Sequence, residues 1–220
     1  MAKRVAVVLS GCGHLDGSEI TEAVCALIAL DLSGAEVQCY APDKDQLHVI
    51  DHLRGAVVQG ERRGVMREAA RLARGNVKPL SDLRVSDFDA LVFPGGFGAA
   101  KNLCDYAVSG VDCQVDGTVE AIIKETHGVG KPICAICIAP ILIAKCLGKK
   151  AHPVLTLGPG GDASKHAEQM GARHQAATAT QIVVDEANKI VTTSAYMDAT
   201  RIGQVWEGVQ KAIEKVLQMA

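Results

Sequence analysis

One cysteine lies where an apolar run is expected to turn sharply into a helix. Residues 131–140 read Lys-Pro-Ile-Cys-Ala-Ile-Cys-Ile-Ala-Pro, and Cys137 has the small residues Ala135 and Ala139 two positions away on either side. A nucleophile elbow has this form, because the backbone folds back on itself and leaves no room for large neighbours. Pro140 suits a first helical turn, and a helix N-terminus favours thiolate. The spacing fits a reactive Cys137 and a cysteine packed in a core strand equally well.

A cysteine nucleophile needs a partner that moves protons, and two glutamates are candidates. Glu22 lies one turn into the helix expected after the first strand, and Glu19 precedes it by three residues on the same face. An acid at a helix start often only complements the helix dipole, which is the more frequent role for Glu19. A carboxylate raises the pKa of an adjacent thiol, whereas a protonated carboxyl that donates to the thiolate lowers that pKa. Such a pair titrates as a unit and can serve as nucleophile and proton shuttle.

A glycine-rich turn supplies candidate donors for a developing negative charge. The segment Pro94-Gly-Gly-Phe-Gly98 follows an expected strand, so the backbone N–H groups at Gly95 and Gly96 come to the rim of the sheet. Together with the N–H of Ile138 they can form an oxyanion hole. The same glycines are also what a tight turn with positive φ requires.

Two other motifs compete with this interpretation. The segment Gly11-Cys-Gly-His-Leu-Asp-Gly17 resembles a dinucleotide fingerprint, but three residues rather than two separate its last glycines. Cys134 and Cys137 form a C-x-x-C, yet three strand residues place their Cα atoms ~10 Å apart, beyond the roughly 7 Å limit for a disulfide. No second C-x-x-C or H-x₃-H completes a zinc site. We therefore expect no cofactor and no metal.

The loop Ser10–Gly17 also carries two further candidates near the expected site. Cys12 can act as a resolving thiol, although a cysteine in such a position is more often packed. His14 is the histidine nearest to the expected site. We include Cys12 and His14, with Glu19 and Gly95, as neighbours of the candidate site.

The length and composition of the chain limit the classes of protein to which it can belong. The chain has 220 residues, enough for one domain with a full hydrophobic core, which we expect to span residues 1–220. A net charge of −2 without a basic run argues against binding to nucleic acid or to a membrane surface. The apolar run Val5 to Leu9 is too short for a signal peptide or a membrane span. Eight cysteines without a secretion signal indicate a cytoplasmic protein, or one of the mitochondrial matrix if a transit peptide has been removed.

Short β-branched runs alternate with helical patterns, which predicts a doubly wound α/β fold with helices on both faces of a mainly parallel sheet. The expected strands are Arg4–Leu9, Ala35–Ala41, Ala90–Phe93 and Pro132–Ile136, followed by a hairpin of Ile182–Val184 and Lys189–Thr193. In such sheets the site lies beyond the carboxyl ends of the strands. We therefore expect the loop after the first strand, the glycine turn and the elbow to lie together at the carboxyl edge of the sheet.

Capping residues and apolar periodicity predict three helices. The first is expected to have Ser18 as its N-cap and to end at Ser33, before Gly34. The segment Pro42–Leu83 reads as an excursion with a helix at Val65–Arg74. The last helix carries an apolar stripe that we expect to face the core, made of Ile202, Val205, Trp206, Val209, Ile213 and Val216.

Several segments together resemble the PfpI branch of the class I glutamine-amidotransferase-like superfamily. They are Asp89-Ala-Leu-Val-Phe-Pro-Gly-Gly, Lys101-Asn-Leu and Ala135-Ile-Cys-Ile-Ala-Pro140. The resemblance narrows to the ElbB group, which includes a bacterial glyoxalase-like protein and mitochondrial relatives in animals, on Ser10-Gly-Cys-Gly, Asp16-Gly-Ser-Glu-Ile, Ala41-Pro-Asp-Lys and Val191-Thr-Thr-Ser-Ala-Tyr-Met.

The resemblance runs essentially from end to end and carries several implications. It implies a flavodoxin-like fold in a single domain of this type, and a homodimer. It also implies that Cys137 is the nucleophile, that Glu22 is its carboxylate partner, and that the backbone of Gly96 and Ile138 forms the oxyanion hole.

Departures from the family pattern narrow the expected chemistry. Peptidase-like members carry a histidine after the elbow cysteine, where this chain has Ile138, and no His-x-Glu of the glutaminases follows Thr193. Cofactor-free glyoxalase relatives often place a histidine on the strand after the elbow helix. In this chain the corresponding segment reads Leu155-Thr-Leu-Gly158 and contains no histidine. The expected triad is thereby reduced to a Cys–Glu dyad, with His152 as an outside candidate for the missing imidazole.

These observations favour a cofactor-independent, glyoxalase III-like lyase acting on glyoxal or a similar small α-oxoaldehyde. Cys137 would form a hemithioacetal, and the product would be a 2-hydroxy acid such as glycolate. One alternative is a redox-responsive sensor or protective binding protein. Another is an amidotransferase-like partner protein, which the missing His-x-Glu disfavours.

Overall fold

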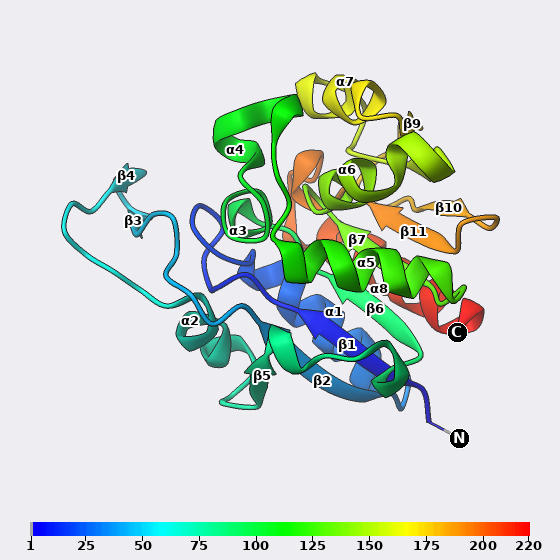
Figure 1. Cartoon of the computed structure of the whole chain (residues 1–220), viewed down its shortest axis with the longest axis horizontal. Helices are drawn as coiled ribbons and strands as arrows, with labels where there is room; N and C mark the ends of the chain where they lie inside the picture. The colour runs from blue at the N-terminus through cyan, green and yellow to red at the C-terminus, as the bar shows by residue number, and fades with distance from the viewer. Residues whose placement is uncertain (1) are drawn as a thin grey trace.

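A seven-stranded sheet forms the centre of the computed structural model, which describes residues 2–220 (Figure 1). All neighbouring strands pair in parallel except β10 and β11, which form the antiparallel hairpin. In spatial order the strands are β10 (Val183–Asp185), β11 (Ile190–Thr193), β7 (Ile133–Ile136), β6 (Ala90–Phe93), β1 (Arg4–Val8), β2 (Glu36–Ala41) and β5 (Val77–Pro79).

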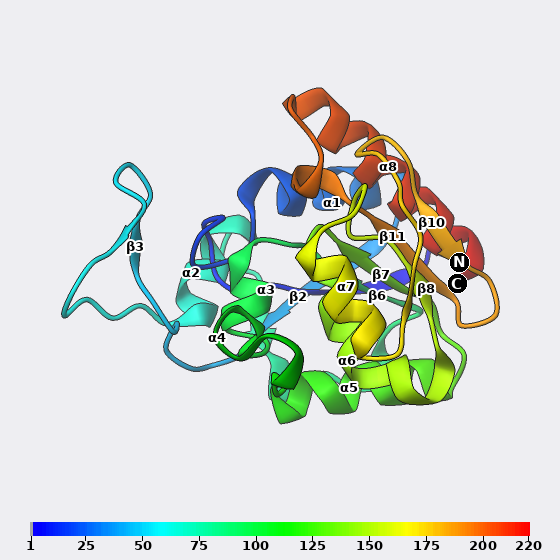
Figure 2. The ribbon, with the colours of Figure 1, turned by 90° about the horizontal axis from the view of Figure 1, so that it is seen from above.

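Helices cover both faces of this sheet, as Figure 2 shows from above. Alternate strand residues point to opposite faces, so Val5 and Val7 join one apolar cluster and Ala6 and Val8 join the other. The first face is covered by α1 (Ile20–Leu32), α2 (Val65–Leu72) and α8 (Ile202–Met219). The other is covered mainly by α5 (Gly117–Gly128) and α6 (Pro140–Ala151), with α3 (Phe97–Lys101), α4 (Tyr106–Ser109) and α7 (Asp162–Gln169) beside them.

Smaller elements lie around this core. The strands β3 (Ile50–Asp51) and β4 (Ala56–Val57) pair in an arm that projects from the body (Figures 1 and 2). A second small pair joins β8 (Val154–Leu155) to β9 (Arg173–His174). Single 3₁₀ turns are η1 (Leu80–Asp82), η2 (Val85–Asp87), η3 (Gly110–Asp112) and η4 (Ala195–Met197). Within residues 2–220, no helix has the length and apolar character needed to cross a membrane.

The predicted fold class is confirmed, whereas some details of the helices were wrong. The N-cap of α1 is Glu19 rather than Ser18, because the Ser18 hydroxyl accepts a hydrogen bond from the backbone N–H of Ser10 at 2.9 Å. The helix in the excursion ends at Leu72 rather than Arg74. Trp206 is only partly buried, and Ile202 on the same predicted core stripe is exposed.

Candidate active site

Cys137 lies on a strained turn between β7 and α6. Its φ is +60°, in the left-handed region that a residue with a Cβ rarely adopts, at a cost of about 1–3 kcal/mol. The turn is held from the neighbouring strand, because the Cys137 N–H donates to the carbonyl oxygen of Thr193 at 2.9 Å. The flanking Ala135 and Ala139 are fully buried, so the small residues fill the tight space that the turn leaves. Cys137 itself is 7% exposed.

Glu22 comes from the first turn of α1 and is fully buried beside this cysteine. Its carboxyl is hydrogen-bonded to the Cys137 thiol. It also accepts backbone hydrogen bonds from Gly95 at 3.1 Å and from Tyr196 at 3.4 Å. Burial, reinforced by the negative charge of Glu19, raises the pKa of Glu22 to about 8, although the three hydrogen bonds act in the opposite direction. The carboxyl therefore retains its proton around neutral pH.

The environment of the sulfur combines groups that oppose and favour thiolate. Burial raises the pKa of Cys137 well above its ordinary value, and the charge and hydrogen bond of Glu22 raise it further. Hydrogen bonds from the backbone N–H groups of Gly96 and Ile138 lower it. Two such donors directed at one sulfur form a cradle for negative charge. Since the two acids interact strongly, they titrate as a pair, and loss of the first proton leaves one proton shared between Glu22 and Cys137.

Glycine is required at positions 95 and 96 because a Cβ has no room at either, and at Gly96 also because of its backbone conformation. A Cβ on Gly95 would lie 2.4 Å from the Cβ of Cys137 and 2.5 Å from Oε2 of Glu22. Gly96 has a φ of +92°, and a Cβ there would lie 2.3 Å from the backbone nitrogen of Glu19. The turn is thus wedged between the elbow and the start of α1, which brings its N–H groups to the sulfur.

Glu19 acts on Glu22 in two ways, through a hydrogen bond and through its negative charge. As the N-cap of α1, its Oε2 accepts a hydrogen bond from the backbone N–H of Glu22 at 2.6 Å. This bond fixes the first turn of the helix on which Glu22 is carried. Glu19 therefore acts as a cap and as a nearby negative charge that favours protonated Glu22.

The other two candidate neighbours lie elsewhere on the loop. The exposed ring of His14 packs edge-on against His52, with 5.0 Å between ring centroids. Cys12 is partly buried, and burial together with the charge of Glu68 on α2 raises the pKa of its thiol. Among residues 2–220, no hydrogen bond joins either side chain to Glu22 or Cys137.

His152 does not supply the missing imidazole. It caps the far end of α6, twelve residues beyond Pro140 and so ~18 Å along the helix. Its exposed ring is engaged there, since Nδ1 lies 2.9 Å from the carbonyl oxygen of Gly171. The helix that carries Cys137 at its start thus carries His152 away from the site.

The segment after β11 contributes groups that sequence reasoning missed. Tyr196 donates its N–H to Glu22, and the preceding Ala195 has a φ of +41°, so this turn is also strained. Ser194 follows Thr193, which pairs with Ile136, so Ser194 lies beside Cys137 in the register of the two strands. Its buried hydroxyl has no hydrogen-bond partner within the described residues. The available signal was the position of this segment at the end of an expected strand.

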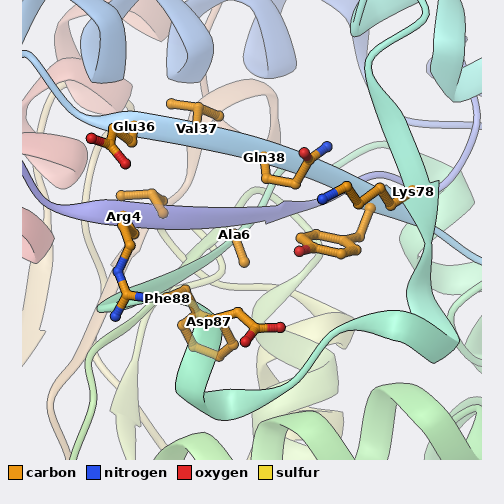
Figure 3. Close-up of a pocket in the computed structure, with 10 residues that line it drawn as sticks. Arg4, Ala6, Glu36, Val37, Gln38, Lys78, Asp87 and Phe88 are labelled. Atoms are coloured by element: carbon orange, nitrogen blue, oxygen red, sulfur yellow. The ribbon is translucent and has the colours of Figure 1, made fainter.

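Figure 3 shows a different pocket, on the sheet face near the start of β1 and β2. Its charged residues include Arg4, which is paired with Asp89 at 3.1 Å, and Lys78 and Asp87 on the rim. None of its lining residues is a cysteine or a histidine. Cys137, by contrast, follows the carboxyl end of β7. Across residues 2–220, no three metal-ligating side chains gather into a metal site.

Comparisons with known proteins agree on the family. Residues 5–202 match the model of the DJ-1/PfpI family. A human protein, "Glutamine amidotransferase-like class 1 domain-containing protein 3, mitochondrial", is 44% identical over 99% of this chain and 84% of its own length. The rat "ES1 protein homolog, mitochondrial" is 44% identical over 98% of this chain and 84% of its own. A solved structure from Ehrlichia chaffeensis, an isoprenoid biosynthesis protein with an amidotransferase-like domain, superposes with a TM-score of 0.91 at 35% identity, covering 99% and 100% of the two chains.

Proposed function

Because this chain belongs to the DJ-1/PfpI family, we propose that it is a cofactor-independent enzyme of the glyoxalase III type. Its substrate would be glyoxal or a similarly small α-oxoaldehyde, and its product a 2-hydroxy acid, glycolate in the case of glyoxal. The observation that supports this proposal is the buried Glu22–Cys137 hydrogen bond, next to two backbone N–H donors.

The first step uses the proton that the pair shares. With the proton on Glu22, the Cys137 thiolate adds to one aldehyde carbon, and a C–S bond forms while the carbonyl π electrons move to oxygen. The N–H groups of Gly96 and Ile138 stabilise this oxyanion; one such donor is commonly worth about 3 kcal/mol. Glu22 then gives its proton to the oxygen, which leaves a hemithioacetal and a Glu22 carboxylate.

The second step needs a base, which the first step has just generated. The Glu22 carboxylate removes the proton from the carbon attached to sulfur and returns it to the neighbouring carbon through an enediol. The first carbon thereby becomes a thioester and the second an alcohol, with no external oxidant or reductant. Water hydrolyses the thioester, which releases the 2-hydroxy acid and restores the thiol.

The surroundings of the pair favour a small substrate. Cys137 is 7% exposed and Glu22 is fully buried, so a long chain has little access to the sulfur. Ile138 occupies the position at which peptidase-like relatives carry a histidine, so no imidazole is available there to protonate an amine leaving group. These features support aldehydes over peptides or glutamine.

We further propose a homodimer and a reducing compartment. The solvent face of α1 carries the exposed apolar side chains of Ile20, Val24, Ile28 and Leu32, a stripe suited to packing against a second copy. All eight cysteines are free, as expected of a reducing environment. The names of the human and rat relatives make the mitochondrial matrix the alternative to the cytoplasm.

The decisive measurement is glycolate formation from glyoxal by the wild type and by Cys137→Ala. We expect glycolate only from the wild type. Cys134→Ala is a matched control, because Cys134 is a buried thiol within β7, three residues before the elbow, and its side chain joins the core. Its activity should persist. Equal rates from wild type and Cys137→Ala would overturn the proposal.

A further inference from the structure

Two buried cysteines that the proposed reaction does not use lie together beside α4. Cys104 and Cys113 are brought close by two antiparallel backbone segments: Cys104 bridges Val115, and the N–H of Asp105 donates to the carbonyl oxygen of Gln114 at 3.1 Å. In this register Cys104 and Cys113 are diagonal neighbours on the same face of the pair, a position in which Cα atoms are ~7–8 Å apart. A disulfide between them therefore needs a small backbone movement. That movement involves only one isolated bridge, whereas Cys134 lies within a strand of the central sheet. Both belong to the apolar cluster under α5 and α6. The Cys104 thiol donates to the carbonyl oxygen of Ala99 at 3.3 Å, and the two thiols interact closely enough for each to shift the pKa of the other.

The two thiols have different environments. The interaction with the neighbouring Cys104 thiol lowers the pKa of Cys113, and the ammonium group of Lys145 on α6 acts in the same direction against the effect of burial. Lys145 is held there by a 2.9 Å hydrogen bond to the carbonyl oxygen of Val111. The interaction with Cys113, together with burial, raises the pKa of Cys104. The arrangement is that of an attacking thiol with an adjacent resolving thiol.

We propose that Cys104 and Cys113 form a reversible disulfide when a peroxide reaches them, and that this dithiol is a redox modification site separate from Cys137. The inference does not depend on the proposed glyoxalase activity. The segment between the two cysteines holds only α4 and η3 and is largely solvent-exposed, with Val108 71% exposed. Local opening of such a segment requires little free energy and admits a small oxidant.

The reaction is balanced by the peroxide alone. The Cys113 thiolate attacks one peroxide oxygen, the O–O bond breaks, and a sulfenic acid forms while the other oxygen leaves as water after gaining a proton. The sulfur of Cys104 then attacks the Cys113 sulfur, loses its proton, and expels the sulfenic oxygen as a second water. The Cys104 thiol leaves the carbonyl oxygen of Ala99, and the two sulfurs close to the ~2 Å of a disulfide. A dithiol reductant reverses the reaction.

Both cysteines fall in one tryptic peptide, which makes the test direct. No lysine or arginine lies between Lys101 and Lys124, so trypsin releases residues 102–124 with Cys104 and Cys113 together. The full-length Cys137→Ala protein is treated with hydrogen peroxide, alkylated, digested without reductant and analysed by mass spectrometry. We expect this peptide without alkyl groups and two hydrogen atoms lighter than its reduced form, and we expect a reductant to restore both alkylation sites.

Matched variants identify the partner. Cys146 lies near Cys113 and is also buried, so Cys146→Ser is the control in which the disulfide should persist. In Cys104→Ser, the Cys113 sulfenic acid should accumulate and be trapped by dimedone. Full alkylation of the 102–124 peptide after peroxide, a cross-link from Cys113 to Cys146, or an unchanged disulfide in Cys104→Ser would each overturn the proposal. Because the background lacks Cys137, none of these outcomes bears on the glyoxalase function.

Discussion

The Glu22 carboxyl hydrogen-bonds the Cys137 thiol, although the two residues are 115 positions apart and come from helix α1 and the turn before helix α6. Both lie in the interior, so neither acid can lose its proton to nearby water without an energetic cost. The pair thereby becomes one titrating unit, and its behaviour provides sharp tests of the site.

Replacement of Glu22 by Gln should lower the pKa of Cys137. The charge and the hydrogen bond of Glu22 both raise that pKa, and the amide removes the charge while the N–H groups of Gly96 and Ile138 stay in place. Alkylation rate as a function of pH measures the pKa, with Cys134→Ala as background. A higher pKa in Glu22→Gln would contradict this prediction and show that a protonated Glu22 stabilises the thiolate.

The stability of the wild type should fall with pH relative to Glu22→Gln. Burial raises the pKa of Glu22 from 4.5 to about 8 on folding, so the folded state binds this proton more tightly than the unfolded state. The resulting stabilisation is present below pH 4.5 and is lost as pH rises to about 8, by on the order of 5 kcal/mol. Urea unfolding of both proteins across this window measures the difference, and parallel stability curves would refute the buried acid.

Gly95→Ala should reduce activity by roughly 100-fold, because the new methyl group would displace Cys137 or Glu22 by a fraction of an ångström or more. Gly128→Ala in helix α5 is the matched control, since a Cβ there meets no atom within 4 Å. Glycolate formation and circular dichroism should be measured together. An active, folded Gly95→Ala protein would mean that the geometry of this turn is not critical.

His152→Ala should leave glycolate formation unchanged. The ring lies at the far end of α6 and bonds to Gly171, so its removal affects only an exposed hydrogen bond. A large loss of kcat with retained folding would require an imidazole in the reaction and would contradict the dyad.

Ile28→Asp should convert a dimer to a monomer, because it places a charge in the exposed apolar stripe of α1. Light scattering after size exclusion measures the mass. Val129→Asp introduces the same charge at an exposed valine beyond helix α5 and should leave the dimer intact. A wild-type protein that is already monomeric would disprove the interface.

The fold could be predicted well from the sequence because strands, helices and helix ends are indicated by patterns of neighbouring residues. Alternating β-branched runs and helical patterns indicate a parallel sheet covered on both faces, and Gly34, with φ at +70°, ends α1 as predicted. The error at the start of α1 arises from a tertiary contact: Ser18 bonds to Ser10 in the loop after β1, so Glu19 takes over the cap.

The site was only partly predictable for the same reason. Glu22 and Cys137 could be expected at one edge because parallel strands end together. The contribution of Tyr196 depends on β11 pairing with β7, a contact between distant segments that no local pattern encodes. His152 was a reasonable candidate by residue type, but the direction of α6 excludes it.

The pairing of β11 with β7 ties the assembly of the site to one late step of folding. The carbonyl of Thr193 anchors the Cys137 turn, and the N–H of Tyr196 donates to Glu22, so both members of the pair depend on β11 and the turn after it. A folding intermediate in which β11 is not yet paired lacks both hydrogen bonds. The geometry of the site is therefore complete only after this contact between distant segments has formed.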